Sequence, residues 1–125
     1  MNRIIPVLVL ALACSTSPLE VREISQDDLL SEPDSTLILD VRTSSEFSSG
    51  HVPNAVNIPH DQLAGRLAEI EDFRNASVVV YCEQGGRAGM AASVLADAGF
   101  STIRHLEGDM SGWRERDLPT ETAGT

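Results

Sequence analysis

The chain has 125 residues, a length that supports one domain with a hydrophobic core but is too short for two. Hydrophobic residues make up 42% of the chain and charged residues 22%, a composition typical of globular rather than disordered proteins. The formal net charge is −10 and all nine basic residues are arginines, so we do not expect nucleic acid among its partners.

The N-terminal segment has the pattern of an export signal. Arg3 precedes an apolar run over residues 4–13, which is too short to span a bilayer comfortably as a permanent helix. The letters LALAC, which end at Cys14, resemble the lipidation motif of bacterial lipoproteins, in which the cysteine becomes the first residue of the mature chain. A cleaved secretory signal without lipid and an uncleaved anchor are the alternatives.

The lipoprotein interpretation leads to a set of expectations about location. We expect a signal peptide over residues 1–13, a lipidated Cys14 and a polar tether over residues 14–20. The protein would then lie in the bacterial cell envelope, on the periplasmic or outer-membrane face, and would contact the membrane only through its lipid. Without the lipid it would be soluble in the periplasm.

Strand patterns alternate with helix patterns along the rest of the chain. Ser25 is placed to cap a helix over residues 26–32, and nearly continuous apolar runs over 35–41 and 77–81 indicate strands buried on both faces. Shorter patterns indicate strands at 21–25, 56–59 and 101–106, with a turn-rich stretch at 43–55.

Two further helices and a short terminal one complete the sequence pattern. Apolar residues at helical spacing predict a helix over 61–73, and a helix over 87–98 would be closed by Gly99. Residues 111–118 are expected to form a short terminal helix. The alternation predicts an α/β fold in three layers, with about five mainly parallel strands and helices on both faces of the sheet.

The most informative stretch surrounds Cys82, which follows the strand at 77–81 directly. Ligands collect at the carboxyl ends of strands in open parallel sheets, and the next helix begins near Arg87. Gly85 and Gly86 permit a tight turn whose backbone N–H groups point inward, and these donors would stabilise the Cys82 thiolate. The alternative is that Cys82 is a small buried hydrophobic residue at the end of a strand.

The loop and its flanking segments resemble the rhodanese (sulfurtransferase) family. The letters CEQGGRA, from Cys82 to Ala88, are similar to the active-site loop of that family, Cys-x-x-Gly-x-Arg. The stretches LILDVRTSSEFSSGHVPNAVNIP (37–59) and LADAGFSTIRHLEGDMSGW (95–113) are similar to its upstream and C-terminal motifs. The resemblance covers about residues 21–118, and we expect residues 119–125 to form a flexible tail.

The resemblance implies a mechanism in which Cys82 carries a sulfur atom as a persulfide. A sulfane sulfur would pass from thiosulfate or a persulfide donor to Cys82, and then to cyanide or a thiol, without a metal or an organic cofactor. The anion cradle would be formed by the backbone of Glu83, Gln84, Gly85, Gly86 and Arg87.

The loop length distinguishes this family from its relatives. Four residues separate Cys82 from Arg87, as in sulfurtransferases, whereas the related phosphatases and arsenate reductases have five. A phosphatase or arsenate reductase is therefore disfavoured. A non-catalytic binding or redox-sensing module with the same fold is the alternative from a different class.

Other positions match the family motifs in supporting roles. Asp40 is expected to orient loops by hydrogen bonds, and Arg42 either meets an anionic substrate or forms a surface ion pair. Glu46 and His51 are expected to fix loops, and Trp113 to lie in the core or in a pocket wall. The three histidines, His51, His60 and His105, lack the spacing of a metal site.

Two positions depart from the family pattern. Glu83 places an acid where a thiosulfate dianion would approach, which should weaken thiosulfate binding at low salt. Asp109 stands where the family usually has a second glycine after Gly108.

Overall fold

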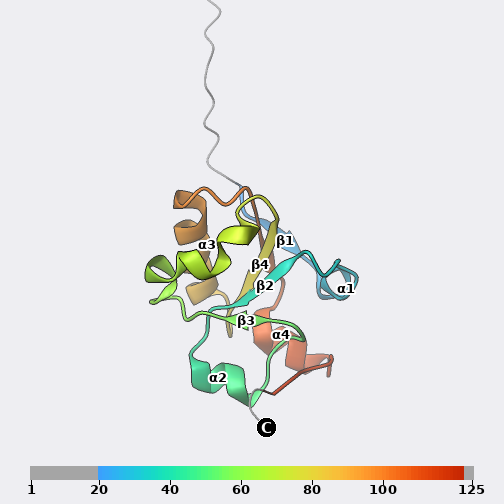
Figure 1. Cartoon of the computed structure of the whole chain (residues 1–125). Helices are drawn as coiled ribbons and strands as arrows, with labels where there is room; N and C mark the ends of the chain where they lie inside the picture. Colours follow the sequence, from blue (N-terminus) through green and yellow to red (C-terminus); the bar gives the residue numbers. More distant parts are fainter. Residues whose placement is uncertain (1–19, 123–125) are drawn as a thin grey trace, which may run out of the picture.

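The computed structural model describes residues 20–122 as a five-stranded parallel sheet with helices on both faces (Figure 1). The expected signal peptide, Cys14 and most of the tether lie outside the described residues, as do residues 123–125. The strand order is β1-β5-β4-β2-β3, and every neighbouring pair is parallel. The strands are β1 (Arg22–Ile24), β2 (Leu37–Asp40), β3 (Val56–Asn57), β4 (Ser77–Tyr81) and β5 (Thr102–Leu106).

The helices divide between the two faces of the sheet, which confirms the expected fold class. Helix α3 (Gly86–Asp97) and the 3₁₀ helices η1 (Leu63–Gly65) and η2 (Leu67–Phe73) pack on one face. Helices α1 (Gln26–Leu30) and α4 (Asp109–Glu115) pack on the other, and α2 (Ser44–Ser49) follows β2 at the carboxyl end of the sheet.

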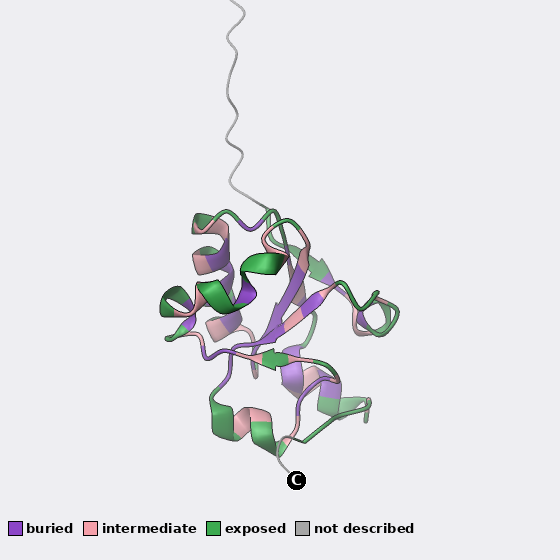
Figure 2. Cartoon of the chain, in the orientation of Figure 1, coloured by how far each residue is buried: buried purple, intermediate pink, exposed green. Residues whose placement is uncertain are grey.

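The central strand β4 contributes side chains to both cores. Val78, Val80 and the following Cys82 belong to the core under α3, whereas Val79 and Tyr81 belong to the core under α1 and α4. All five are buried, which explains the continuous apolar run in the sequence, because a strand covered on both faces has no polar side (Figure 2).

Local signals placed several element ends correctly. Ser25 caps α1 by accepting a hydrogen bond from the Asp28 N–H at 3.0 Å. Gly99, after the end of α3, has a φ of +88°, the left-handed conformation that the helix end requires. Helix α3 begins one residue earlier than expected, and α4 spans Asp109–Glu115 rather than 111–118.

Two stretches differ from the sequence prediction. The turn-rich stretch at 43–55 contains α2, whose first turn is stabilised by a capping box between Thr43 and Glu46. The helix expected over 61–73 is instead formed by η1 and η2, with non-helical dihedral angles at Ile70. Residues three apart lie in line in a 3₁₀ turn, and Leu67, Ile70 and Phe73 all reach the core with this spacing.

Part of the expected flexible tail is bound to the domain. The backbones of His51 and Glu121 exchange two N–H···O bonds of 2.9 Å, and the Trp113 indole donates to the Pro119 carbonyl at 2.8 Å. The start of the expected tail is therefore bound to the domain, because Glu121 pairs with the loop after α2 and Pro119 with α4.

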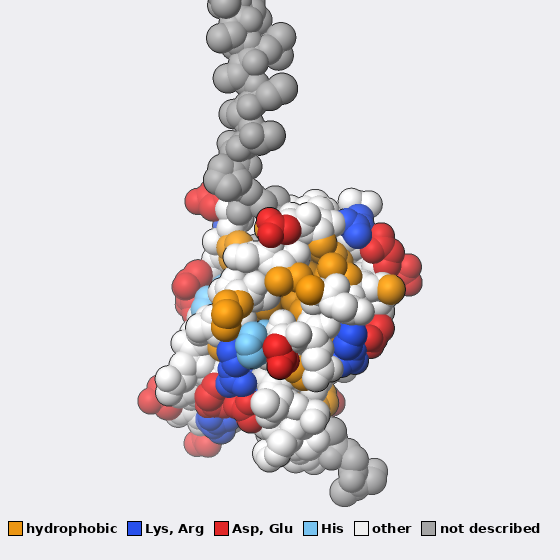
Figure 3. All heavy atoms as spheres, turned by 90° about the vertical axis from the view of Figure 1, so that its left-hand side faces the viewer, with side chains coloured by type: hydrophobic (Ala, Val, Ile, Leu, Met, Phe, Trp, Pro, Cys, Tyr) orange, Lys and Arg blue, Asp and Glu red, His pale blue; other side chains and the backbone are white. Residues whose placement is uncertain are grey.

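The surface combines both signs of charge. Figure 3 shows arginine side chains beside acidic ones, with an area of exposed hydrophobic side chains on the same face. Within residues 20–122, no helix is long and apolar enough to cross a membrane.

Candidate active site

The geometry places Cys82 at the carboxyl end of β4, at the start of the loop that leads into α3. Its Sγ accepts a hydrogen bond from the Gly85 N–H at 2.9 Å, and the residue is 1% exposed. Gly85 has a φ of +117°, which a glycine adopts without steric cost and which turns this N–H back toward the sulfur. Gly86 opens α3, and Gln84 lies exposed between the cysteine and the glycines.

The far end of the loop is fixed by α2. Two guanidinium nitrogens of Arg87 donate to the two carboxylate oxygens of Glu46, at 2.6 and 3.0 Å. Donation from Arg87 lowers the pKa of Glu46 to about 2, and the Glu46 carboxylate raises the pKa of Arg87. Glu46 therefore holds Arg87 beside the cysteine loop, consistent with the loop-fixing role expected for it.

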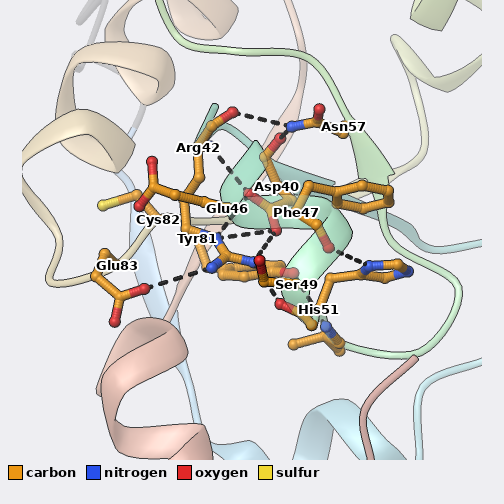
Figure 4. Close-up of polar contacts among 12 residues, drawn as sticks. Asp40, Arg42, Glu46, Phe47, Ser49, His51, Asn57, Tyr81, Cys82 and Glu83 are labelled. Atoms are coloured by element: carbon orange, nitrogen blue, oxygen red, sulfur yellow. Dashed lines mark hydrogen bonds and ion pairs between the residues drawn. The ribbon is translucent and has the colours of Figure 1, made fainter. Parts of the chain in front are cut away.

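Asp40 and Arg42 form a buried ion pair under the site (Figure 4). Arg42 donates from Nε and Nη2 to the Asp40 carboxylate at 2.8–3.1 Å, and from Nη2 to the Gly50 carbonyl at 2.8 Å. Asp40 is 0% exposed and Arg42 2%. Of the two alternatives for Arg42, the surface ion pair is wrong, because β2 and the loop after α2 enclose its guanidinium.

Glu83, the acid next to the cysteine, lies between two arginines. One oxygen accepts from Arg42 Nη1 at 3.3 Å, as Figure 4 shows, and the other accepts from Arg114 of α4. The backbone carbonyl of Glu83 also accepts the Ser111 N–H at 3.1 Å. The Glu83 carboxylate, which we expected to repel an approaching thiosulfate ion, is therefore compensated by the positive charges of Arg42 and Arg114.

A hollow of about 410 Å³ lies beside these groups at the carboxyl end of the sheet. Its lining includes Arg42, Glu46, Glu83, Met110 and Arg114. It is large enough for a small sulfur compound, and it places charged side chains of both signs around that space. Among residues 20–122, no group of three or more histidine, cysteine or acidic residues is arranged to hold a metal ion.

Two residues that were not predicted as site residues, Asp109 and His105, lie behind the loop. Asp109 accepts a hydrogen bond from the Cys82 N–H at 3.0 Å and another from His105 Nε2 at 2.9 Å. The only signal was the acid in place of a family glycine, and its φ of +53° shows why glycine is usual there. His51, by contrast, lies where expected in a loop, with Nδ1 bound to the Phe47 carbonyl at 2.8 Å.

Comparison with known sequences identifies relatives with sulfurtransferase names. The chain is 31% identical to a "Sulfurtransferase" of Allochromatium vinosum over 102 residues, which cover 79% of this chain and 94% of that protein. It is 34% identical to "Thiosulfate sulfurtransferase 16, chloroplastic" of Arabidopsis thaliana, over 66% of this chain and 78% of that one. It is also 38% identical to an HTH-type transcriptional regulator of Mycobacterium tuberculosis, but spans only 37% of that protein.

Solved structures and a family model agree with the fold and the motifs. A rhodanese-related protein from Thermoplasma volcanium has a TM-score of 0.71 and 30% identity, with 80% of this chain and 97% of that chain covered. An E. coli structure described as "rhodanese with anions" has a TM-score of 0.60 and 26% identity, over 70% of this chain and 99% of that chain. The model of the rhodanese-like domain matches residues 23–116. The chain therefore belongs to the rhodanese-like domain family.

Proposed function

We propose that the chain is a sulfurtransferase that carries a sulfane sulfur on Cys82. The observation that carries this proposal is the hydrogen bond from the Gly85 N–H to Cys82 Sγ, 2.9 Å long, inside a four-residue loop closed by Arg87. A backbone donor aimed at the sulfur stabilises negative charge there, which both the thiolate and the persulfide require. The sulfurtransferases among the relatives support the same reaction class.

The reaction is a double displacement without net oxidation of the protein. The Cys82 thiolate attacks the outer sulfur of thiosulfate or of a persulfide, and the sulfur–sulfur bond of the donor breaks. Sulfite or a thiolate leaves with the electron pair, and Cys82 retains the sulfur as a persulfide. A cyanide ion or a thiolate then attacks the terminal sulfur, so that thiocyanate or a new persulfide departs and the Cys82 thiolate is restored.

The charges around the hollow favour a persulfide donor over thiosulfate. Each of the arginines beside the site is paired with an acid: Arg42 with Asp40 and Glu83, Arg114 with Glu83, and Arg87 with Glu46. A thiosulfate dianion would have to compete with these carboxylates for the guanidinium groups, whereas a persulfide on a small thiol carries less charge at the reacting end. We therefore propose that the donor is a thiol persulfide.

The test is an intact-mass measurement of the purified protein. Incubation with thiosulfate or with a low-molecular-weight persulfide should add one sulfur atom, and cyanide should remove it. The Cys82→Ser variant should acquire none. If neither donor produces an adduct while an alkylating agent still modifies Cys82, the chain is a binding or redox-sensing module. Hydrolysis of phosphate esters would instead assign it to the phosphatase class.

We also propose that Cys14 carries lipid and anchors the protein in a bacterial cell envelope. The support is the LALAC pattern after a basic start and a short apolar run. In a bacterial expression host, the membrane fraction should contain the protein with the added mass of a lipid on residue 14. The Cys14→Ser variant should lose this mass and leave the membrane fraction, and an unlipidated wild type would overturn the proposal.

A further inference from the structure

A buried carboxylate lies directly behind the cysteine loop. Asp109, the first residue of α4, is 2% exposed, and its Oδ1 accepts the Cys82 N–H at 3.0 Å. Both of its oxygens lie within hydrogen-bond distance of His105 Nε2, at 2.9 and 3.0 Å. The backbone of the cysteine is therefore connected to a histidine of β5 through one carboxylate.

The pair also closes the space behind Gly85. A Cβ atom on Gly85 would lie 3.2 Å from Asp109 Oδ2 and 3.7 Å from His105 Cε1. The N–H of the same Gly85 donates to Cys82 Sγ. Asp109 thus binds the Cys82 amide directly, and Asp109 and His105 together line the space beside the glycine whose N–H donates to the sulfur.

The charges in this arrangement need compensation. A buried carboxylate next to a cysteine that must carry a thiolate or a persulfide anion places two negative charges close together, which disfavours both. The ring of His105, when it is protonated, supplies the positive charge that balances Asp109. A neutral imidazole donates the same hydrogen bond without that charge.

His105 is in contact with acids from two other elements. Glu23 of β1 lies with Oε1 at 3.6 Å from His105 Nδ1, and Asp109 is the partner on α4. On the α3 side, the groove that His105 lines includes Asp97, and on β4 its register partner is the apolar Val80. Donation to Asp109 raises the pKa of His105 above its usual 6.5, although burial opposes this shift.

The direction of this pKa shift sets the pH range in which His105 is protonated. The stabilisation by the protonated ring is complete below about pH 6.5 and is lost as the pH rises through the higher pKa of the folded protein. His105 is 24% exposed, so it exchanges protons with solvent.

We propose that Asp109 and His105 are positioning residues of this enzyme: the carboxylate orients the Cys82 backbone, and the protonated imidazole compensates its charge beside the sulfur anion. The inference rests on the proposed function. Sulfur transfer is then fastest while His105 is charged, and it slows on the alkaline side as the ring loses its proton. Asp109 adopts the left-handed conformation at a steric cost, which two hydrogen bonds to its carboxylate offset.

The first experiment requires no sulfur donor. The Cys82 amide signal and the His105 ring signals are followed by NMR in the wild type from about pH 5 to about pH 9. We expect the Cys82 amide to shift with the same midpoint as His105. In His105→Gln, which keeps a donor but cannot be charged, the amide should lose this transition. His60→Gln is the matched control and should leave it unchanged.

The carboxylate is tested with two substitutions that both tolerate the positive φ. Asp109→Asn keeps an acceptor for the Cys82 N–H but removes the charge, so the pKa of His105 should fall. Asp109→Gly keeps the backbone and removes the acceptor, and should lower kcat by about tenfold with little change in KM, the effect of about one lost hydrogen bond.

The pH profile of sulfur transfer completes the test. The alkaline decline of kcat/KM in the wild type should be absent in His105→Gln, whose rate below that decline should be about tenfold lower. The inference would be overturned if the chemical shift of the Cys82 amide did not change as His105 titrates. It would also be overturned if kcat/KM showed the same alkaline decline in the wild type and in His105→Gln. A wild type that accepts no sulfur would instead refute the proposed function, and the NMR titration would still decide whether the pair is linked to Cys82.

Discussion

Glu46 and Arg87 are 41 positions apart in the sequence, yet their side chains form a two-point ion pair with O···N distances of 2.6 and 3.0 Å. The pair connects α2 to the end of the cysteine loop. Because α2 follows β2 and the loop follows β4, the parallel pairing of these two strands brings both segments to the same edge of the sheet.

The acid stability of the domain should depend on this pair. The pKa of Glu46 is lowered from 4.5 to about 2, so its contribution to stability is complete above about pH 4.5 and is lost as the pH falls toward about 2. We expect Glu46→Gln to reduce the free energy of unfolding at neutral pH by less than about 1 kcal/mol, because both side chains are partly exposed. Urea denaturation at a series of pH values measures this.

The difference between Glu46→Gln and the wild type should shrink through the same acid window. Glu69→Gln is the matched control, because it also breaks an acid–arginine pair, the exposed one with Arg66, at a position far from the cysteine. It should leave the rate of sulfur transfer unaltered. A difference that stays constant down to pH 2 would show that Glu46 acts through packing rather than charge.

Donor preference should respond to Glu83. Glu83→Gln removes the carboxylate that pairs with Arg114 and, at 3.3 Å, with Arg42, whose main partner remains Asp40. The loss of this negative charge should raise kcat/KM for thiosulfate by roughly threefold to tenfold at low ionic strength and less at high salt. The rate with a thiol persulfide should change little. Steady-state kinetics with both donors at two salt concentrations provides the comparison.

Glu115→Gln is the control for a general charge effect, because it removes an exposed acid from the same helix as Arg114. An equal gain with thiosulfate in this variant would mean that net charge, rather than the contacts of Glu83, governs donor binding.

The buried pair under the site should be essential for stability. Asp40→Asn leaves the Arg42 guanidinium enclosed without its main counter-charge, and we expect a loss of about 3 kcal/mol in the free energy of unfolding. The double variant Asp40→Leu/Arg42→Met, in which no charge is buried, should recover much of the loss. If Asp40→Asn alone unfolds like the wild type in urea, Arg42 obtains its compensation from Glu83 instead.

Replacing either of two glycines near the start of α3 with alanine should have opposite effects on the stability of the protein. Gly85→Ala places a side chain at a φ of +117° and a Cβ 3.2 Å from Asp109 Oδ2, so we expect a loss of about 1 to 2 kcal/mol and impaired sulfur transfer. Gly89→Ala adds a Cβ that meets no atom within 4 Å apart from its own neighbouring helix backbone, and it should stabilise the protein by about 0.5 to 1 kcal/mol. Thermal unfolding of both variants distinguishes them, and equal effects would contradict the strain argument.

Local chemistry in the sequence was enough to identify most of the fold. The apolar run at β4, the cap at Ser25 and the glycine after α3 each act within a few residues, so their signals are present in a short window. The same holds for the cysteine loop, whose four-residue spacing and glycines are a local pattern. The capping box at Thr43 was also readable, but the many serine residues around it made a turn-rich stretch the simpler prediction.

The pairing of charges around Cys82 follows from contacts between segments that are far apart in the sequence. Arg42 and Glu83 are 41 positions apart and Cys82 and Asp109 are 27, and nothing in the sequence specifies which acid contacts which donor. These contacts follow from the parallel register of the sheet, which brings the segments after β2, β4 and β5 to one edge. A short stretch of residues was thus enough to locate the candidate nucleophile and its loop, whereas the packing of the strands fixed which charges surround it, because hydrogen bonds between distant segments depend on how those segments meet in space.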